Sequence, residues 1–209
     1  MRDADVRTAV RRMLHDQYGD ESDTRIVEEM GIWAGSARID VAVINGQLIG
    51  YELKSDRDSL DRLPGQIALY NRVFDKVSLV VGAKHVRNAR LLIPRWWGIV
   101  VAYSTANGVK LRNGRRARAN PAPDAMTVAQ LLWRDEALAI LEKRGGARGW
   151  RSKTASQLHA HLATTLSFAD LGAEVRGALR LRRGWLRQLT HHQAEMPVDS
   201  DLDPSLTTP

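Results

Sequence analysis

The chain has 209 residues, long enough for one well-cored domain plus an appendage. It has no cysteine, and its 44% hydrophobic and 26% charged residues are typical of a globular protein. The absence of cysteine excludes disulfides and thiolate metal sites, and no apolar run is long enough for a membrane span or a secretory signal. We therefore expect a cytoplasmic protein with no membrane partner. The formal net charge of +7 favours a polyanionic partner, although charge alone does not separate nucleic acid from an acidic protein.

The first hundred residues predict a helix followed by a β-hairpin. Apolar residues at helical spacing predict the helix over residues 5–18, with Gly19 as its stop. Residues 24–33 fit either a helix end or a strand. Residues 38–54, RIDVAVINGQLIGYELK, alternate in polarity on both sides of Asn45-Gly46, which predicts a hairpin that turns at this dipeptide.

The register of this hairpin decides whether Asp40 and Glu52 lie together. A two-residue loop pairs Asp40 with Tyr51 and separates the two acids. A three-residue loop, residues 44–46 with Gly46 in the left-handed conformation, pairs Asp40 with Gly50 and puts both acids on one face. We favour the second register because it gathers the large apolar side chains on the other face: Ile39, Val41, Val43, Ile49, Tyr51 and Leu53.

An acid on one strand with Glu-x-Lys on its neighbour predicts a divalent-cation site. Carboxylate oxygens are the hard ligands that Mg²⁺ prefers, and they leave room for water and phosphate. Lys54 follows Glu52 by two positions and so shares its face. The lysine would stabilise charge on a phosphate or help to deprotonate the attacking water.

With these residues the chain resembles the PD-(D/E)XK nuclease superfamily, which has the restriction-endonuclease-like fold. The resemblance is carried by Asp40, by the run Glu52-Leu53-Lys54 and by Glu29 in IVEEMGI, whereas Ile39 stands where the family usually has proline. Residues 1–104 are similar to a compact bacterial nuclease-like subgroup of unassigned role.

The resemblance implies a role for each residue of the motif. Asp40, Glu52 and the Leu53 carbonyl would hold Mg²⁺ or Mn²⁺, and Lys54 would act on the water and the phosphate. Glu29 would complete or orient the cluster, with Glu28 as the alternative acid.

Two residues of the next helix extend the predicted site. Residues 60–74 give a helical stripe that Pro64-Gly65 kinks or splits, and Gln66 and Tyr70 share a face four residues apart. In the superfamily a glutamine and an aromatic residue on this helix approach the metal or the phosphate. The alternative is that Tyr70 belongs to the core and Gln66 to the helix surface.

The remaining segments complete an α/β fold: a restriction-endonuclease-like core with a mixed sheet flanked by helices, plus an α-helical C-terminal extension. Strands are predicted at residues 76–81 and 98–103, with a helix at 85–92 between them. We expect four parts: the nuclease-like core at 1–104, a basic loop or small hairpin at 105–124, a helical basic extension at 125–195, and a disordered acidic tail at 196–209.

The predicted function is a Mg²⁺ or Mn²⁺ dependent deoxyribonuclease. The alternative is a catalytically inactive nuclease-fold module that binds nucleic acid or a protein partner. RNA is a second candidate substrate, and a homodimer is compatible with the resemblance because cutting two strands needs two sites. The expected phosphate contacts are Arg176, Arg180 and Arg187 of the extension with Arg115 and Arg116 of the basic loop.

Overall fold

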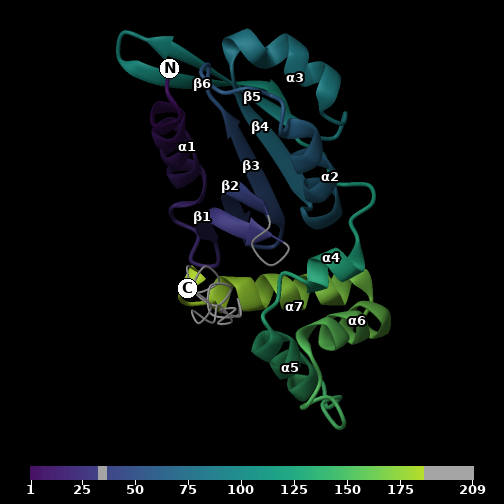
Figure 1. Ribbon diagram of the computed structural model, residues 1–209. Coiled ribbons are helices and arrows are strands. Elements are labelled where there is room, and N and C mark those ends of the chain that lie inside the picture. The colour runs from purple at the N-terminus through teal and green to yellow at the C-terminus, as the bar shows by residue number, and fades with distance from the viewer. Residues whose placement is uncertain (33–36, 186–209) are drawn as a thin grey trace, which may run out of the picture.

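The computed structural model describes residues 1–32 and 37–185, and its centre is one six-stranded sheet (Figure 1). The strands lie side by side in chain order: β1 (Arg25–Ile32), β2 (Ala37–Ile44), β3 (Leu48–Lys54), β4 (Lys76–Gly82), β5 (Gly98–Thr105) and β6 (Gly108–Arg115). Strands β3, β4 and β5 are parallel, and the other neighbouring pairs are antiparallel. The predicted α/β class with a mixed sheet is confirmed, and residues 25–32 form a strand rather than a helix end.

Helices cover both faces of this sheet (Figure 1). Helix α1 (Asp3–Tyr18) buries Val6, Val10 and Leu14 on one face, as its helical spacing predicts. The opposite face is covered by α2 (Leu63–Val73) and α3 (Val86–Leu92), which follows the short 3₁₀ turn η1 (Ala83–His85). Pro64 lies in the first turn of α2, where its missing N–H removes no helical hydrogen bond, so it begins the helix instead of kinking it.

The loop of the β2–β3 hairpin lies one residue later than predicted. Ile44 pairs with Leu48, so the loop is Asn45-Gly46-Gln47, and Gly50 stands opposite Ala42 rather than Asp40. Gly46 is not at positive φ. The Asn45 side chain closes the turn by accepting the Gln47 N–H at 2.9 Å, so no left-handed glycine is required.

The predicted apolar face breaks at Asp40. Ile39 packs with Ala42 on the α2 face, whereas Val41 packs against α1. The pairing across β1 and β2 is interrupted between Glu28↔Val41 and Met30↔Ile39, and Glu29 at this break has a φ of 51°. A backbone irregularity therefore reverses the alternation in both strands at the predicted site, which periodicity alone does not reveal.

The C-terminal helical part packs directly on the sheet domain. It comprises α4 (Ala125–Ala129), α5 (Arg134–Lys143), α6 (Ala155–Thr165) and α7 (Phe168–Leu181). Leu158, Leu171 and Val175 of these helices belong to the same buried cluster as Met30 of the sheet. The boundary predicted at residue 104 falls inside β5, because residues 108–115 form the sixth strand of the sheet, the second arm of a hairpin.

Two arginines of α7 that we expected to contact phosphates form ion pairs with acids of the sheet domain. Arg176 lies 3.4 Å from Asp75, and Arg180 lies 3.6 Å from Asp23, so both hold α7 against the sheet domain. Arg115 is also engaged, because it donates to the carbonyls of Trp97 and Pro94. Arg116 is exposed, whereas Arg187 and the predicted tail at 196–209 lie outside the described residues. In the part of the chain that the structure describes, no helix is both long enough and apolar enough to cross a bilayer.

Candidate functional site

A buried carboxylate, Glu52 on β3, is the centre of the candidate site. Glu52 has only 1% of its surface exposed, and its Oε1 accepts from Lys54 Nζ at 2.7 Å and from Gln66 Nε2 at 2.6 Å. The hydroxyl of Tyr70 lies 2.9 Å from Oε2. Strand β3 thus supplies the Glu-x-Lys pair and helix α2 supplies the glutamine and the tyrosine, as the sequence predicted. Tyr70 is fully buried, so it is a core residue that also reaches the site.

The tyrosine contact bears on the protonation of Glu52. The Tyr70 hydroxyl also lies 2.6 Å from the Arg38 backbone carbonyl, which can only accept. One hydroxyl proton cannot serve both acceptors at once, so the Tyr70 hydroxyl donates either to Glu52 or to this carbonyl. Burial, then the nearby charge of Asp40, raises the pKa of Glu52, while Lys54 and Tyr70 act in the opposite direction.

Asp40 lies between the two strands rather than above one face. Its Oδ2 accepts the Leu53 N–H at 2.7 Å, and its Oδ1 accepts from Arg7 Nη2 of α1 at 3.0 Å. Because a backbone N–H points along the sheet, the carboxylate lies close to the sheet plane, whereas Glu52 faces α2. The two acids interact electrostatically, with Asp40 reaching Glu52 from the plane of the sheet.

Glu29 is turned toward α1, not toward Glu52. Its Oε1 lies 3.0 Å from Arg7 Nη2, and its Oε2 lies 3.8 Å from Arg38 Nε. The same Arg7 nitrogen therefore bridges Glu29 and Asp40. Glu28 pairs with Arg11 and lies 3.8 Å from Arg7 Nη1. Sequence analysis missed Arg7, since an arginine beside the buried Val6 in an amphipathic helix carries no signal of what it faces.

The left-handed backbone at Glu29 gives a testable prediction about strain. A non-glycine residue in this conformation costs about 1–2 kcal/mol, part of which glycine recovers. We expect Glu29→Gly to unfold with a free energy about 1 kcal/mol higher than that of Glu29→Ala, because both variants lose the carboxylate and only one relieves the strain. Urea denaturation measures the difference. Equal stabilities would mean that the strand break carries no strain.

The donor set suits a hard divalent cation in part. Asp40, Glu52 and the Leu53 carbonyl are oxygen ligands, and the buried Gln66 Oε1 has no hydrogen-bond partner in the described structure. An unpaired buried acceptor beside a carboxylate favours a cation or water there. The predicted three-carboxylate cluster is not formed, since no three His, Cys, Asp or Glu side chains within residues 1–32 and 37–185 have metal-binding geometry.

The chain is similar to a family of proteins that is named after a bacteriophage protein. The fold is that of an α/β protein with a mixed sheet and a helical C-terminal part, with a buried Glu-Lys pair in its central strand. Residues 1–195 match the family of bacteriophage P4 protein cII, and the chain belongs to that family.

Two individual proteins are similar to this chain. Protein cII of Enterobacteria phage P4 is 29% identical over 145 residues, which are 69% of this chain and 54% of that protein, so the chain spans about half of its curated relative. A solved structure, the SPO1766 protein of unknown function from Silicibacter pomeroyi, is 18% identical, with a TM-score of 0.42 over 73% of this chain and 93% of the other.

Proposed function

We propose that the protein is a metal-dependent phosphodiesterase that cuts DNA in the cytoplasm, with Asp40, Glu52 and Lys54 as its active site and a PD-(D/E)XK-like arrangement. The observation that supports the proposal best is the convergence on the Glu52 carboxylate. Lys54, Gln66 and Tyr70 come from two separate elements, and each reaches one of its two oxygens within 3 Å. A surface acid on an ordinary strand would not gather three polar partners from two elements.

The residues have distinct parts in hydrolysis. Asp40, Glu52 and the Leu53 carbonyl would hold Mg²⁺ or Mn²⁺, which supplies Lewis-acid activation of water and of the phosphate when bound. The Lys54 ammonium donates to a phosphate oxygen and offsets the charge that develops there. Gln66 and Tyr70 keep Glu52 in place. Water oxygen bonds to phosphorus as the bond to the leaving oxygen breaks, and the proton released by the water ends on the leaving group through solvent.

Access to the site lies on the side of Asp40. The Asp40 side chain is 21% exposed, whereas those of Glu52 and Lys54 are 2% and 7% exposed. Arg7, at 16% exposure, stands on the same side and neutralises Asp40. A cation that binds Asp40 Oδ1 would compete with this guanidinium, which would keep its contact to Glu29 or contact a phosphate oxygen.

The contact between Arg7 and Asp40 also favours a second candidate, a nuclease-fold module that binds nucleic acid without cutting it. In such a module Arg7 would serve as a permanent counter-ion for Asp40. Lys54 would play the same part for Glu52, and no metal would be needed.

Cleavage assays separate the two candidates. We expect the purified protein to cut single-stranded or duplex DNA in Mg²⁺ or Mn²⁺, and Asp40→Asn to cut at least about 100-fold more slowly, because its metal ligand acts in the transition state. Asp61→Asn, an exposed acid in the loop before α2, is the matched control and should cut like the wild type. An RNA arm of the same assay identifies the preferred nucleic acid.

Two results would count against an enzyme. If the wild type cuts no nucleic acid with either metal yet binds DNA, the binding module replaces the nuclease. If Asp40→Asn cuts as fast as the wild type, the cleavage does not come from this site.

A further inference from the structure

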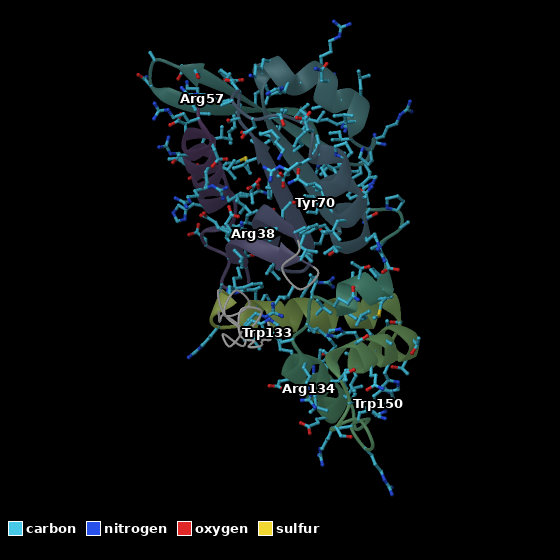
Figure 2. The ribbon with its side chains drawn as sticks, in the orientation of Figure 1. Arg38, Arg57, Tyr70, Trp133, Arg134 and Trp150 are labelled. Atoms are coloured by element: carbon cyan, nitrogen blue, oxygen red, sulfur yellow. The ribbon has the colours of Figure 1, made fainter. Side chains whose placement is uncertain are left out.

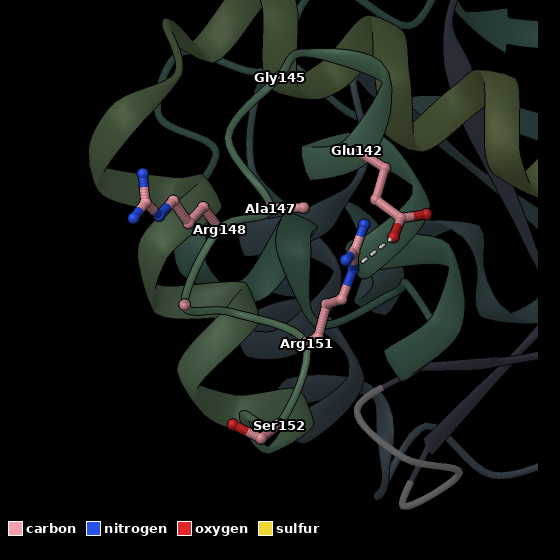
Figure 3. Close-up of a pocket in the computed structure, with 7 residues that line it drawn as sticks. Glu142, Gly145, Ala147, Arg148, Arg151 and Ser152 are labelled. Carbon is pink, nitrogen blue, oxygen red and sulfur yellow. Dashed lines mark hydrogen bonds and ion pairs between the residues drawn. The ribbon is translucent and has the colours of Figure 1, made fainter.

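The loop between α5 and α6 forms a hollow at the end of the molecule farthest from the sheet (Figures 1 and 3). The hollow has a volume of about 460 Å³ and is lined by Glu142, Gly145, Ala147, Arg148, Gly149, Arg151 and Ser152. Gly145 and Gly149 have φ values of 74° and 80°, conformations in which glycine is favoured. Residues 143–153, KRGGARGWRSK, hold five cations and no acid.

The backbone of this loop is oriented by contacts from inside the helical part. Arg134 donates to the carbonyls of Arg151 and Lys153, the second at 3.1 Å, and Trp150 stacks on His161 with ring centroids 3.8 Å apart (Figure 2). Because C=O and the following N–H point in opposite directions across a trans peptide, the Ser152 N–H points away from Arg134. Within the described residues, the N–H groups of Arg148, Gly149, Arg151 and Ser152 donate to no protein acceptor.

The cations of the loop are available to a ligand. Arg148 and Lys153 form no ion pair within the described part of the chain. Arg151 pairs with Glu142 at 3.1 Å, but the two side chains are 76% and 46% exposed, and such pairs contribute about 0–1 kcal/mol. Arg148 projects away from Glu142 (Figure 3). A phosphate can therefore take Arg151 from Glu142 at little cost and gain a charge-assisted, two-pronged contact.

We propose that the hollow at residues 145–152 binds phosphates of the DNA backbone through Arg148, Arg151 and the outward N–H groups of the loop. Free N–H groups beside arginines form the concave donor set that recognises phosphate oxygens. The site lies away from Glu52 and carries the nucleic-acid contact that we had predicted for the arginines of α7. The proposal rests on the proposed function only in taking DNA as the substrate.

The salt dependence of DNA binding tests this proposal. We would measure the DNA affinity of the wild type and of Arg148→Ala/Arg151→Ala at several salt concentrations. A metal chelator is present, so that no DNA is cut. We expect the log-log slope of affinity against salt to fall by about two and the affinity to fall roughly tenfold on any sequence, because two phosphate contacts are lost. The matched control is Lys84→Ala/Arg87→Ala, two exposed cations in η1 and in α3, which should keep the wild-type slope. Both arginines of the loop are exposed, so thermal melting should confirm an intact fold.

Inorganic phosphate distinguishes a single anion from a polymer backbone. We expect DNA, but not millimolar phosphate, to raise the melting temperature of the wild type more than that of Arg148→Ala/Arg151→Ala. The proposal is overturned by an unchanged slope and affinity in that variant, by an equal loss in the α3 control, or by phosphate alone reproducing the effect of DNA. Because DNA binding is measured without metal, this test of the loop is independent of the cleavage assay. A protein that does not cut DNA can still bind it through the loop, and a protein that cuts DNA can still fail this test.

Discussion

Lys54→Met is expected to lower the free energy of unfolding by about 3–5 kcal/mol, because it leaves the Glu52 carboxylate buried without its counter-ion. Lys54 and Glu52 have 5% and 1% of their surface exposed and lie 2.7 Å apart. Since replacing a whole buried ion pair by apolar residues is often nearly neutral, the double variant Glu52→Leu/Lys54→Met should recover most of that loss. Urea denaturation of the wild type, both single variants and the double variant gives the coupling.

The pH dependence of the same variant gives a second readout. The pKa of Glu52 in the folded protein lies above its usual value of 4.5, and the loss of Lys54 raises this pKa further. At a pH between the pKa of Glu52 in the unfolded state and its pKa in the folded state, the folded state binds more protons, so stability falls as pH rises. The deficit of Lys54→Met should therefore be smaller at pH 5 than at pH 8. A deficit that is constant with pH, or a double variant as unstable as the single, would contradict the buried-pair interpretation.

The sequence predicted the elements of the fold because each carries a local signal. Helix α1 has its buried stripe, β2 and β3 have their alternation, and α2 has Gln66 and Tyr70 on one face. The side chains of α2 reach Glu52 because β3 is an inner strand of the sheet and Glu52 points toward the face that α2 covers. Pattern and resemblance together were sufficient for this half of the site.

The other half depended on contacts that no local pattern contains. The hairpin register is fixed partly by Asp75, which accepts the Leu48 N–H at 2.7 Å from 27 residues away. The position of Asp40 follows from the break at Glu29 and from Arg7, 33 residues upstream. The ion pairs of α7 were not predicted for the same reason, because the helix presents Arg176 and Arg180 to acids of the sheet domain.

A second large effect is expected in the helical part, at Arg182 just after α7. Arg182 is 5% exposed, donates to Glu136 at 2.8 Å and to the Leu131 carbonyl at 2.7 Å, and lies over Trp133 at 4.4 Å and Trp185 at 4.7 Å. The contact to Glu136 closes the end of α7 onto the start of α5. Arg182 therefore joins α7 to α5 and to two tryptophans in the helical part.

Arg182→Ala is expected to lower the free energy of unfolding by about 3–5 kcal/mol, because it removes a buried pair, a carbonyl contact and two cation–π contacts at once. Arg183→Ala, one residue further and exposed, is the matched control and should stay within about 0.5 kcal/mol of the wild type. Arg182→Lys should fall between them, since a lysine keeps the charge but not the planar two-pronged contact. Urea denaturation measures all three. Because the helices and the sheet share one buried cluster, the loss of stability should appear as one cooperative unfolding transition. If Arg182→Ala unfolds at the same urea concentration as the wild type, Glu136 and the tryptophans are held in place without this arginine.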